Sequence, residues 1–106
     1  MPKYMIEAAF TAEGAKGVLG KGGTVRRKAV EAAAKSVGGT LEQFYFAFGA
    51  TDAMAILDLP DHASAAALAL SISSSGSVEA ATTVLLTPEE LDAASKKSPE
   101  YRPPGA

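Results

Sequence analysis

The sequence predicts an α+β protein with a ferredoxin-like fold, in which two helices cover one face of a four-stranded antiparallel sheet. Three observations support this prediction. Two apolar segments flank a four-residue turn at 49–52, one strand-like segment lies on either side of this pair, and a helical segment rich in alanine separates each outer segment from the central pair. The order strand, helix, strand, strand, helix, strand is that of the split βαβ unit.

The first outer strand is predicted at residues 2–10, where Glu7 falls on the face opposite to Tyr4 because strand side chains alternate. Thr11 is expected to cap a short helical turn that passes into a glycine-rich loop. A helix follows over 25–37 and ends at Gly38-Gly39. Its expected buried stripe consists of Val25, Ala29, Ala32, Ala33 and Val37.

The central hairpin spans residues 41–59 and is largely apolar on both faces. In its first strand the phenylalanines share one face, whereas Gln43 and Tyr45 share the other. Across the turn, Met54 and Ile56 alternate with alanine and leucine. A small antiparallel sheet usually keeps one face polar for water. We therefore expect a homo-oligomer, a dimer whose second copy covers the sheet face that the helices leave free.

The second half of the chain supplies the remaining elements. Asp61 is placed to cap a helix over 63–74, and the fourth strand is predicted at 78–86. The inner stripe expected for this helix consists of Ala65, Leu68, Ala69 and Ile72. Thr87 and Pro88 then begin a short C-terminal helix that ends by Lys97. We expect one domain over 1–97 and an extended tail over 98–106, either loose or laid along a neighbouring subunit.

The composition excludes several classes of function. A chain of 106 residues with 47% hydrophobic and 21% charged residues is typical of a single globular domain. Without cysteine it has no disulfide and no thiolate nucleophile. A net charge of −2 gives no global attraction for nucleic acid. Without a membrane-length apolar run or a signal-peptide pattern, we expect a cytoplasmic protein with neither nucleic-acid nor membrane partners.

His62 is the single histidine, so a metal or haem site would have to include it. It follows Pro60-Asp61 at a predicted helix start, where a solvated histidine is common. A metal site usually needs further histidines or grouped carboxylates at ligand spacing, and the sequence has none. We therefore expect neither a metal nor a cofactor.

Glu7 and Tyr45 are the candidate catalytic residues, because both fall on the sheet face away from the helices. A carboxylate in a mostly apolar cavity would have a raised pKa and could exchange a proton with a bound small molecule. Tyr45 or Thr51 would orient that molecule, and Gln43 and Met54 would line the cavity. The alternative is that Glu7 pairs with a basic residue across the dimer interface and that Tyr45 only packs.

Six of the ten basic residues lie in one stretch of twenty residues. The stretch is not a P-loop, because Gly20-Lys21 lacks the preceding glycine and the following serine or threonine of that motif. Lys21, Arg26 and Arg27 lie at or near a predicted helix start and could hold an anion, or they could form a solvated basic face. The sequence thus leaves two hypotheses, a small-molecule binder or cofactor-independent enzyme, and a non-catalytic module that binds an anion or a protein partner through 21–28.

Four segments together resemble one known family over nearly the whole chain. They are KYMIEAAFTAEGAKGVL at 3–19, GGTLEQFYFAFGATDA at 38–53, LPDHASAAALAL at 59–70 and TTVLLTPEELDAA at 82–94. The chain resembles the GYD domain family, small bacterial proteins akin to the dimeric alpha-beta barrel superfamily. That resemblance implies a dimer. Members of the superfamily include cofactor-free monooxygenases, lactone isomerases and haem-dependent enzymes, which work beside the sheet or at the dimer interface.

The signature that names the family, glycine, tyrosine and aspartate, is incomplete here. This chain has Gly49, Thr51 and Asp52 in that place, so a smaller hydroxyl replaces the phenol. One interpretation is that Thr51 and Asp52 bind the ligand. The other is that Gly49 and Asp52 shape the hairpin turn, for which both residue types are strongly selected.

Overall fold

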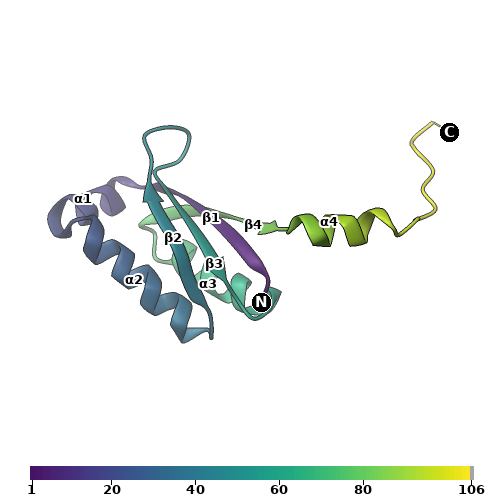
Figure 1. Ribbon diagram of the computed structural model, residues 1–106. Coiled ribbons are helices and arrows are strands. Elements are labelled where there is room, and N and C mark those ends of the chain that lie inside the picture. The colour runs from purple at the N-terminus through teal and green to yellow at the C-terminus, as the bar shows by residue number, and fades with distance from the viewer. Residues whose placement is uncertain (106) are drawn as a thin grey trace.

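The computed structural model describes residues 1–105 and has the predicted architecture. Its elements in chain order are β1 (Lys3–Phe10), α1 (Ala12–Lys21), α2 (Gly23–Ser36), β2 (Thr40–Phe46), β3 (Ala53–Asp58), α3 (His62–Ser74), β4 (Val78–Leu85) and α4 (Pro88–Ser95). The strands lie in the order β2-β3-β1-β4, and every neighbouring pair is antiparallel (Figure 1). This is the ferredoxin-like order, and the sheet is open.

Helices α2 and α3 cover one face of the sheet and enclose the core. On β1 and β3 the buried residues alternate with half-buried ones, and Tyr4 and Leu57 are almost fully buried. From α3, Ala65 and Leu68 join this cluster, and Ile72 packs against it, so the predicted inner stripe of α3 is confirmed. The other face of the sheet, which we call the open face, has no helix over it.

The predicted buried stripe of α2 is wrong over its first turns. The residues that were expected to be buried there but are exposed are Val25, Ala29 and Ala32. Gly23 faces the sheet at the start of this helix, where a Cβ would lie 2.7 Å from Cε2 of Phe46. Arg26 and Val30 follow on that side, with Ala34 fully buried one turn later.

The glycine-rich segment is a complete helix, α1, and the predicted turn and loop are wrong here. Thr11 caps it by accepting a hydrogen bond from the Gly14 N–H at 3.3 Å, and Gly22 at φ 88° ends it and leads directly into α2. Gly14 lies against the start of β4, where a Cβ would collide with the Ser77 carbonyl oxygen. Glycine at this position allows the helix to pack closely against β4. In a sequence pattern the same glycine suggests that the helix ends.

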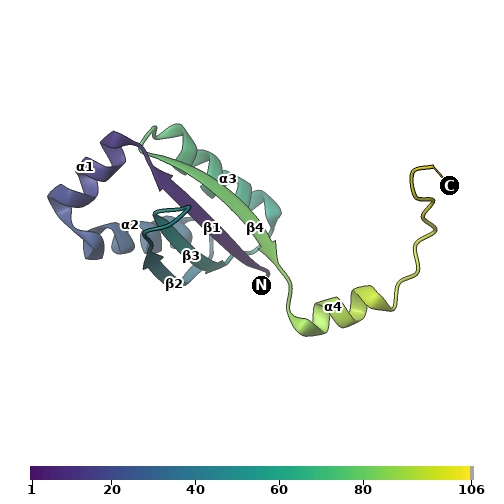
Figure 2. The same cartoon turned by 90° about the horizontal axis from the view of Figure 1, so that it is seen from above.

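Residues 86–105, which we call the C-terminal arm, project away from the rest of the molecule (Figures 1 and 2). The radius of gyration is 16.6 Å, whereas a compact chain of this length has about 13 Å. Within the arm, α4 is fully exposed along its length, although Thr87 and Glu90 form a complete capping box at its start. The arm thus contains a helix without a packing partner in the described part of its own chain.

Candidate functional site

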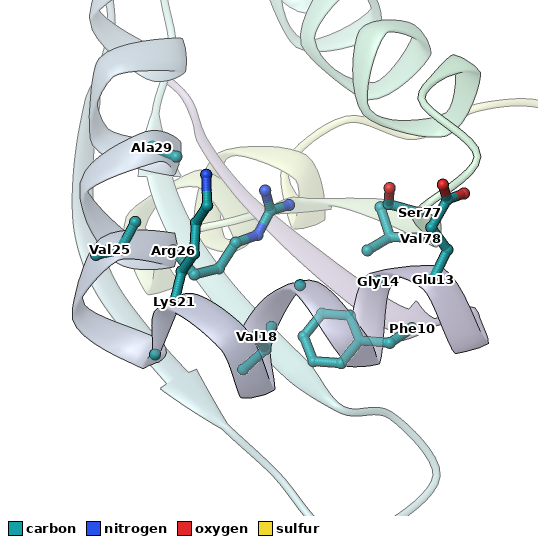
Figure 3. A pocket seen from close by; sticks show the side chains of 12 residues that line it. Phe10, Glu13, Gly14, Val18, Lys21, Val25, Arg26, Ala29, Ser77 and Val78 are labelled. Carbon is teal, nitrogen blue, oxygen red and sulfur yellow. The ribbon is translucent and has the colours of Figure 1, made fainter.

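A recess of about 340 Å³ lies between α1, the first turns of α2 and the start of β4 (Figure 3). We call it the helical pocket. Side chains that line it include Phe10, Glu13, Val18, Lys21, Arg26 and Val78. This volume falls at the lower end of the range for small-molecule sites, which combine apolar walls with a few polar groups.

The helical pocket exists because α1 carries glycines on the side that faces it. Gly14 and Gly17 both line the recess. A Cβ on Gly17 would have no heavy atom within 4 Å, so the space beside it is open. Side chains at these positions would fill the recess, whereas their absence leaves room for a ligand against the helix backbone.

Two basic side chains face this space without an acidic partner. Arg26 is half-buried, and Figure 3 shows its guanidinium reaching across the recess toward Ser77, while Lys21 stands near it. Within residues 1–105 neither forms an ion pair, unlike Arg27, whose Nε lies 3.6 Å from Oε1 of Glu31. The basic cluster of the sequence is therefore divided, because Lys21 and Arg26 face the helical pocket and Arg27 does not.

A smaller apolar cavity lies beside the helical pocket, on the side of the core. This inner cavity has a volume of about 30 Å³ and shares Phe10 and Arg26 with the helical pocket. Val30 and Ile72 line it from α2 and α3. Its volume is enough for a single water or a methyl group. An apolar end of a ligand therefore has a place beyond the basic groups.

The candidate residues Glu7 and Tyr45 lie on the open face but do not meet. The register places Glu7 opposite Met54, and Met54 opposite Tyr45 on the next strand. Glu7 and Tyr45 are therefore two strand spacings apart, about 10 Å. Gln43 lies in the adjoining row, opposite Ile56. Tyr45 is 58% exposed in the isolated chain, so joint action by these residues would need a cover from another molecule.

The remaining signature residues lie at the hairpin and hold it to β1. The Asp52 carboxylate accepts a hydrogen bond from the Phe10 N–H at 2.8 Å, and the Asp52 N–H donates to the Ala8 carbonyl at 2.9 Å. Thr51, in place of the family tyrosine, is half-buried in the same loop. The contacts of Asp52 are structural, and they fix the end of β1 at which Phe10 enters the helical pocket.

An ion-pair network stands at the opposite end of the sheet. Lys3 donates to Glu42 and, at 2.9 Å, to Asp58, and these two hydrogen bonds raise the pKa of Lys3 above its ordinary value. Hydrogen bonding with Glu42 and with Lys3 lowers the pKa of Asp58. Glu7 takes no part in this network and forms no ion pair among residues 1–105.

His62 begins α3 and has a defined partner. Its Nδ1 lies 2.6 Å from the hydroxyl of Tyr4, and the two rings meet edge to face with centroids 5.8 Å apart. His62 was expected only to be solvated, and its contact with the buried Tyr4 was not predicted. In the described part of the chain, no group of three or more histidine and carboxylate side chains could hold a metal ion.

The sequence reasoning missed most of the helical pocket. Phe10, Val18 and Ser77 were not candidates, because α1 was expected to be a short turn. A signal was present, since Thr11 as a cap is followed by Ala15 and Val18 at helical spacing. That signal was outweighed by the frequent glycines.

Comparison with known proteins gives one family. The sequence model of the GYD domain matches residues 4–94. No curated protein and no solved structure matches the chain significantly. Among the described residues, no helix has the length and apolar character needed to cross a membrane. Because the match extends from β1 into α4, the chain belongs to the GYD domain family.

Proposed function

We propose that this protein binds a small molecule with an anionic head and an apolar body in the helical pocket. The observation that carries the proposal is the position of Arg26 and Lys21, which form no ion pair among residues 1–105, beside apolar walls in a recess of about 340 Å³. The proposal keeps the small-molecule ligand of one hypothesis and the basic stretch of the other, but it places the ligand in the helical pocket and not in the cavity expected on the open face.

The chemistry of the lining favours a carboxylate with a short hydrocarbon chain. An arginine guanidinium can hold a carboxylate through two parallel charge-assisted hydrogen bonds, and half-burial of Arg26 makes such bonds stronger than in open water. Phe10, Val18 and Val78 offer apolar surface beside it. Each methylene buried there contributes about 0.8 kcal/mol. Glu13, also on the lining, disfavours ligands with several negative charges.

The geometry supports this pocket better than the proton-transfer site of the open face. Glu7 and Tyr45 are separated by Met54, and the recess that Tyr45 lines together with Gln43 and Glu42 does not include Glu7. The helical pocket, by contrast, is complete within one chain. Ligand binding in the helical pocket therefore needs no second molecule, whereas proton transfer by Glu7 and Tyr45 would need one to cover the open face.

Isothermal titration calorimetry with acetate, butanoate, hexanoate and octanoate tests the proposal. We expect the dissociation constant to fall about fourfold per added methylene until the recess is full, as burial of about 0.8 kcal/mol per methylene implies. Arg26→Gln should abolish most of the binding, whereas Arg27→Gln, which removes an arginine outside the pocket, should leave it nearly unchanged. An equal loss from both variants would point to a nonspecific basic face.

A second pair of variants tests the place of binding. Gly17→Leu puts a side chain into the open space of the helical pocket, and Gly20→Leu puts the same side chain on α1 away from its lining. We expect only Gly17→Leu to block hexanoate. If Gly20→Leu blocks it equally, the effect comes from the helix as a whole and the pocket is not the site.

We also propose that the working form is a homodimer joined through the open face. Half-buried Met5, Met54 and Ile56 and the exposed Tyr45 give this face a large apolar content. Exposed apolar patches of this kind usually mark interaction surfaces. Native mass spectrometry at micromolar concentration tests the state, and a monomer under those conditions would contradict the dimer.

A further inference from the structure

The C-terminal arm is an element that its own chain does not stabilise. Helix α4 has eight residues, and isolated helices shorter than about 12–15 residues are marginal in water. Capping by Thr87 and Glu90 helps its first turn but supplies no packing. The arm nevertheless exposes large apolar side chains, namely Leu86 at 60%, Leu91 at 60% and Tyr101 at 74%. These side chains need a surface that the rest of the chain does not provide.

The direction of the arm is set by local structure, so it points away from its own sheet. Thr87 is extended, with φ −73° and ψ 160°, and its N–H bonds to the Glu90 side chain at 3.0 Å. Both views show α4 continuing outward from the end of β4 (Figures 1 and 2). In this arrangement every residue of α4 is exposed, so α4 has no packing surface in the described part of its own chain. A second molecule could supply that surface.

The charges of the arm complement those of a second copy of this chain. The far end of the arm carries three exposed basic residues that form no ion pair among residues 1–105, Lys96, Lys97 and Arg102, together with one acid, Glu100. The open face carries two carboxylates without a partner in that same part of the chain. They are Glu7, opposite Ala81, and Glu79, opposite Ala9, at the end of the sheet where β4 begins. The chain thus presents both halves of a complementary contact.

We infer that each arm packs across the open face of a second copy, with its basic end beside Glu7 and Glu79 of that copy. The inference rests on the proposed homodimer. In a two-fold arrangement in which the C-terminal ends of the two β4 strands point toward each other, each arm leaves its own sheet and runs along the open face of the partner sheet, so its far end lies where the partner's β4 begins. The open face alone is smaller than the roughly 20–30 residues that each partner gives to a standard interface, and the arm supplies the remainder.

The exchange also gives Glu7 a role that differs from catalysis. Its carboxylate would be neutralised by a lysine or arginine from the arm of the other copy. This agrees with the alternative drawn from the sequence, in which Glu7 pairs with a basic residue across the dimer interface. Such a pair at the edge of an interface contributes more to the choice and orientation of the partner than to affinity.

Paramagnetic relaxation provides the direct test, because the chain has no cysteine and accepts a single engineered one. A nitroxide on Ser98→Cys, an exposed position between the basic residues of the arm, is placed in unlabelled protein that is mixed with ¹⁵N-labelled protein of natural sequence. We expect the strongest broadening at the amide signals of Glu7 and Glu79 in the labelled copy, and weaker broadening on α3, which lies on the other side of the sheet. Broadening confined to α3 would overturn the inference, as would a dimer without any broadening between copies. A monomer in native mass spectrometry would remove the dimer and the exchange together, while leaving ligand binding in the helical pocket standing.

Matched variants test the energetic contribution of the arm. Leu91→Gln should weaken the dimer about 100-fold, because two leucines each worth about tenfold are lost per dimer. Ala93→Gln on the same helix should change the dissociation constant by less than about threefold, since an exposed alanine contributes little. Equal effects from the two variants would contradict the inference. Lys96→Glu with Lys97→Glu should weaken the dimer, and Glu7→Lys with Glu79→Lys should restore it; failure of this restoration would also contradict the pairing.

Discussion

A single methyl group at Gly14 tests whether α1 is docked as the structure shows. In Gly14→Ala the new Cβ would overlap the Ser77 carbonyl oxygen and lie 3.5 Å from Cβ of Phe10. That carbonyl accepts hydrogen bonds from the Thr11 N–H and hydroxyl, each at 3.1 Å. Relief of the overlap must therefore either move α1 or break its anchorage to the start of β4.

The expected magnitude follows from opposing effects. Replacing glycine by alanine inside a helix is favourable by about 1 kcal/mol. Overpacking costs about 1–3 kcal/mol, and loss of a hydrogen bond costs about 0.5–1.5 kcal/mol. The net effect of Gly14→Ala is a fall of about 1–2 kcal/mol in the free energy of unfolding. Gly17→Ala and Gly20→Ala meet no atom within 4 Å, so each should raise that free energy by about 0.5–1 kcal/mol.

Urea unfolding at neutral pH, followed by circular dichroism, measures all three variants against the natural sequence. The order of stability should be Gly17→Ala and Gly20→Ala above the natural protein, and Gly14→Ala below it. If Gly14→Ala is as stable as Gly17→Ala, α1 does not pack against Ser77, and the helical pocket loses one of its walls.

Three further predictions concern the core, the pH dependence and the arm. His62→Ala should lower the free energy of unfolding by about 1–3 kcal/mol, because it leaves the buried Tyr4 hydroxyl without its hydrogen-bond partner. Tyr4→Phe removes that hydroxyl as well and should cost only about 1 kcal/mol. Urea unfolding compares the two variants, and the reverse order would contradict the contact. The lowered pKa of Asp58 means that this carboxylate stabilises the folded state above its ordinary pKa of 3.8, and that the stabilisation is lost as the pH falls through the pKa of the folded protein. The urea midpoint should therefore fall less steeply in acid for Asp58→Asn than for the natural protein. The raised pKa of Lys3 predicts the converse, a loss as pH rises through a value above 10.5, and an unchanged midpoint there would refute it. Thr87→Ala should reduce the helical signal at 222 nm in the monomer without changing the melting temperature, since α4 is exposed throughout; a lower melting temperature would show that α4 supports the body.

The fold could be predicted from the sequence because its strands and α3 are locally consistent with their surroundings. Alternation in β1 and β3 matches the observed burial, and Asp61 caps α3 through the Ser64 N–H at 2.8 Å. The turn residues at 49–52 and Pro60 mark the ends of strands at the same places as these patterns do. Where local preference and tertiary packing point in the same direction, pattern alone locates the element.

Two features of the site could not be predicted because they depend on contacts distant in sequence. Gly14 is required by Ser77, and Gly23 by Phe46, so neither glycine breaks a helix as its local preference suggests. The rotation of α2 that turns Gly23 toward Phe46 separates Arg26 from Arg27, although both belong to the same basic stretch. The sequence could identify the basic residues, but it could not show which of them face a recess.

The measurement that tests the central claim most directly is a ¹⁵N chemical-shift titration of the protein with hexanoate. The account predicts that the amide signals of Gly14, Val18 and Ser77, which line the helical pocket, shift together and saturate with one dissociation constant. The same signals should remain still in Arg26→Gln. Shifts centred on Tyr45 and Met54 would place the ligand on the open face instead, and an absence of saturable shifts would show that the helical pocket does not bind this class of molecule.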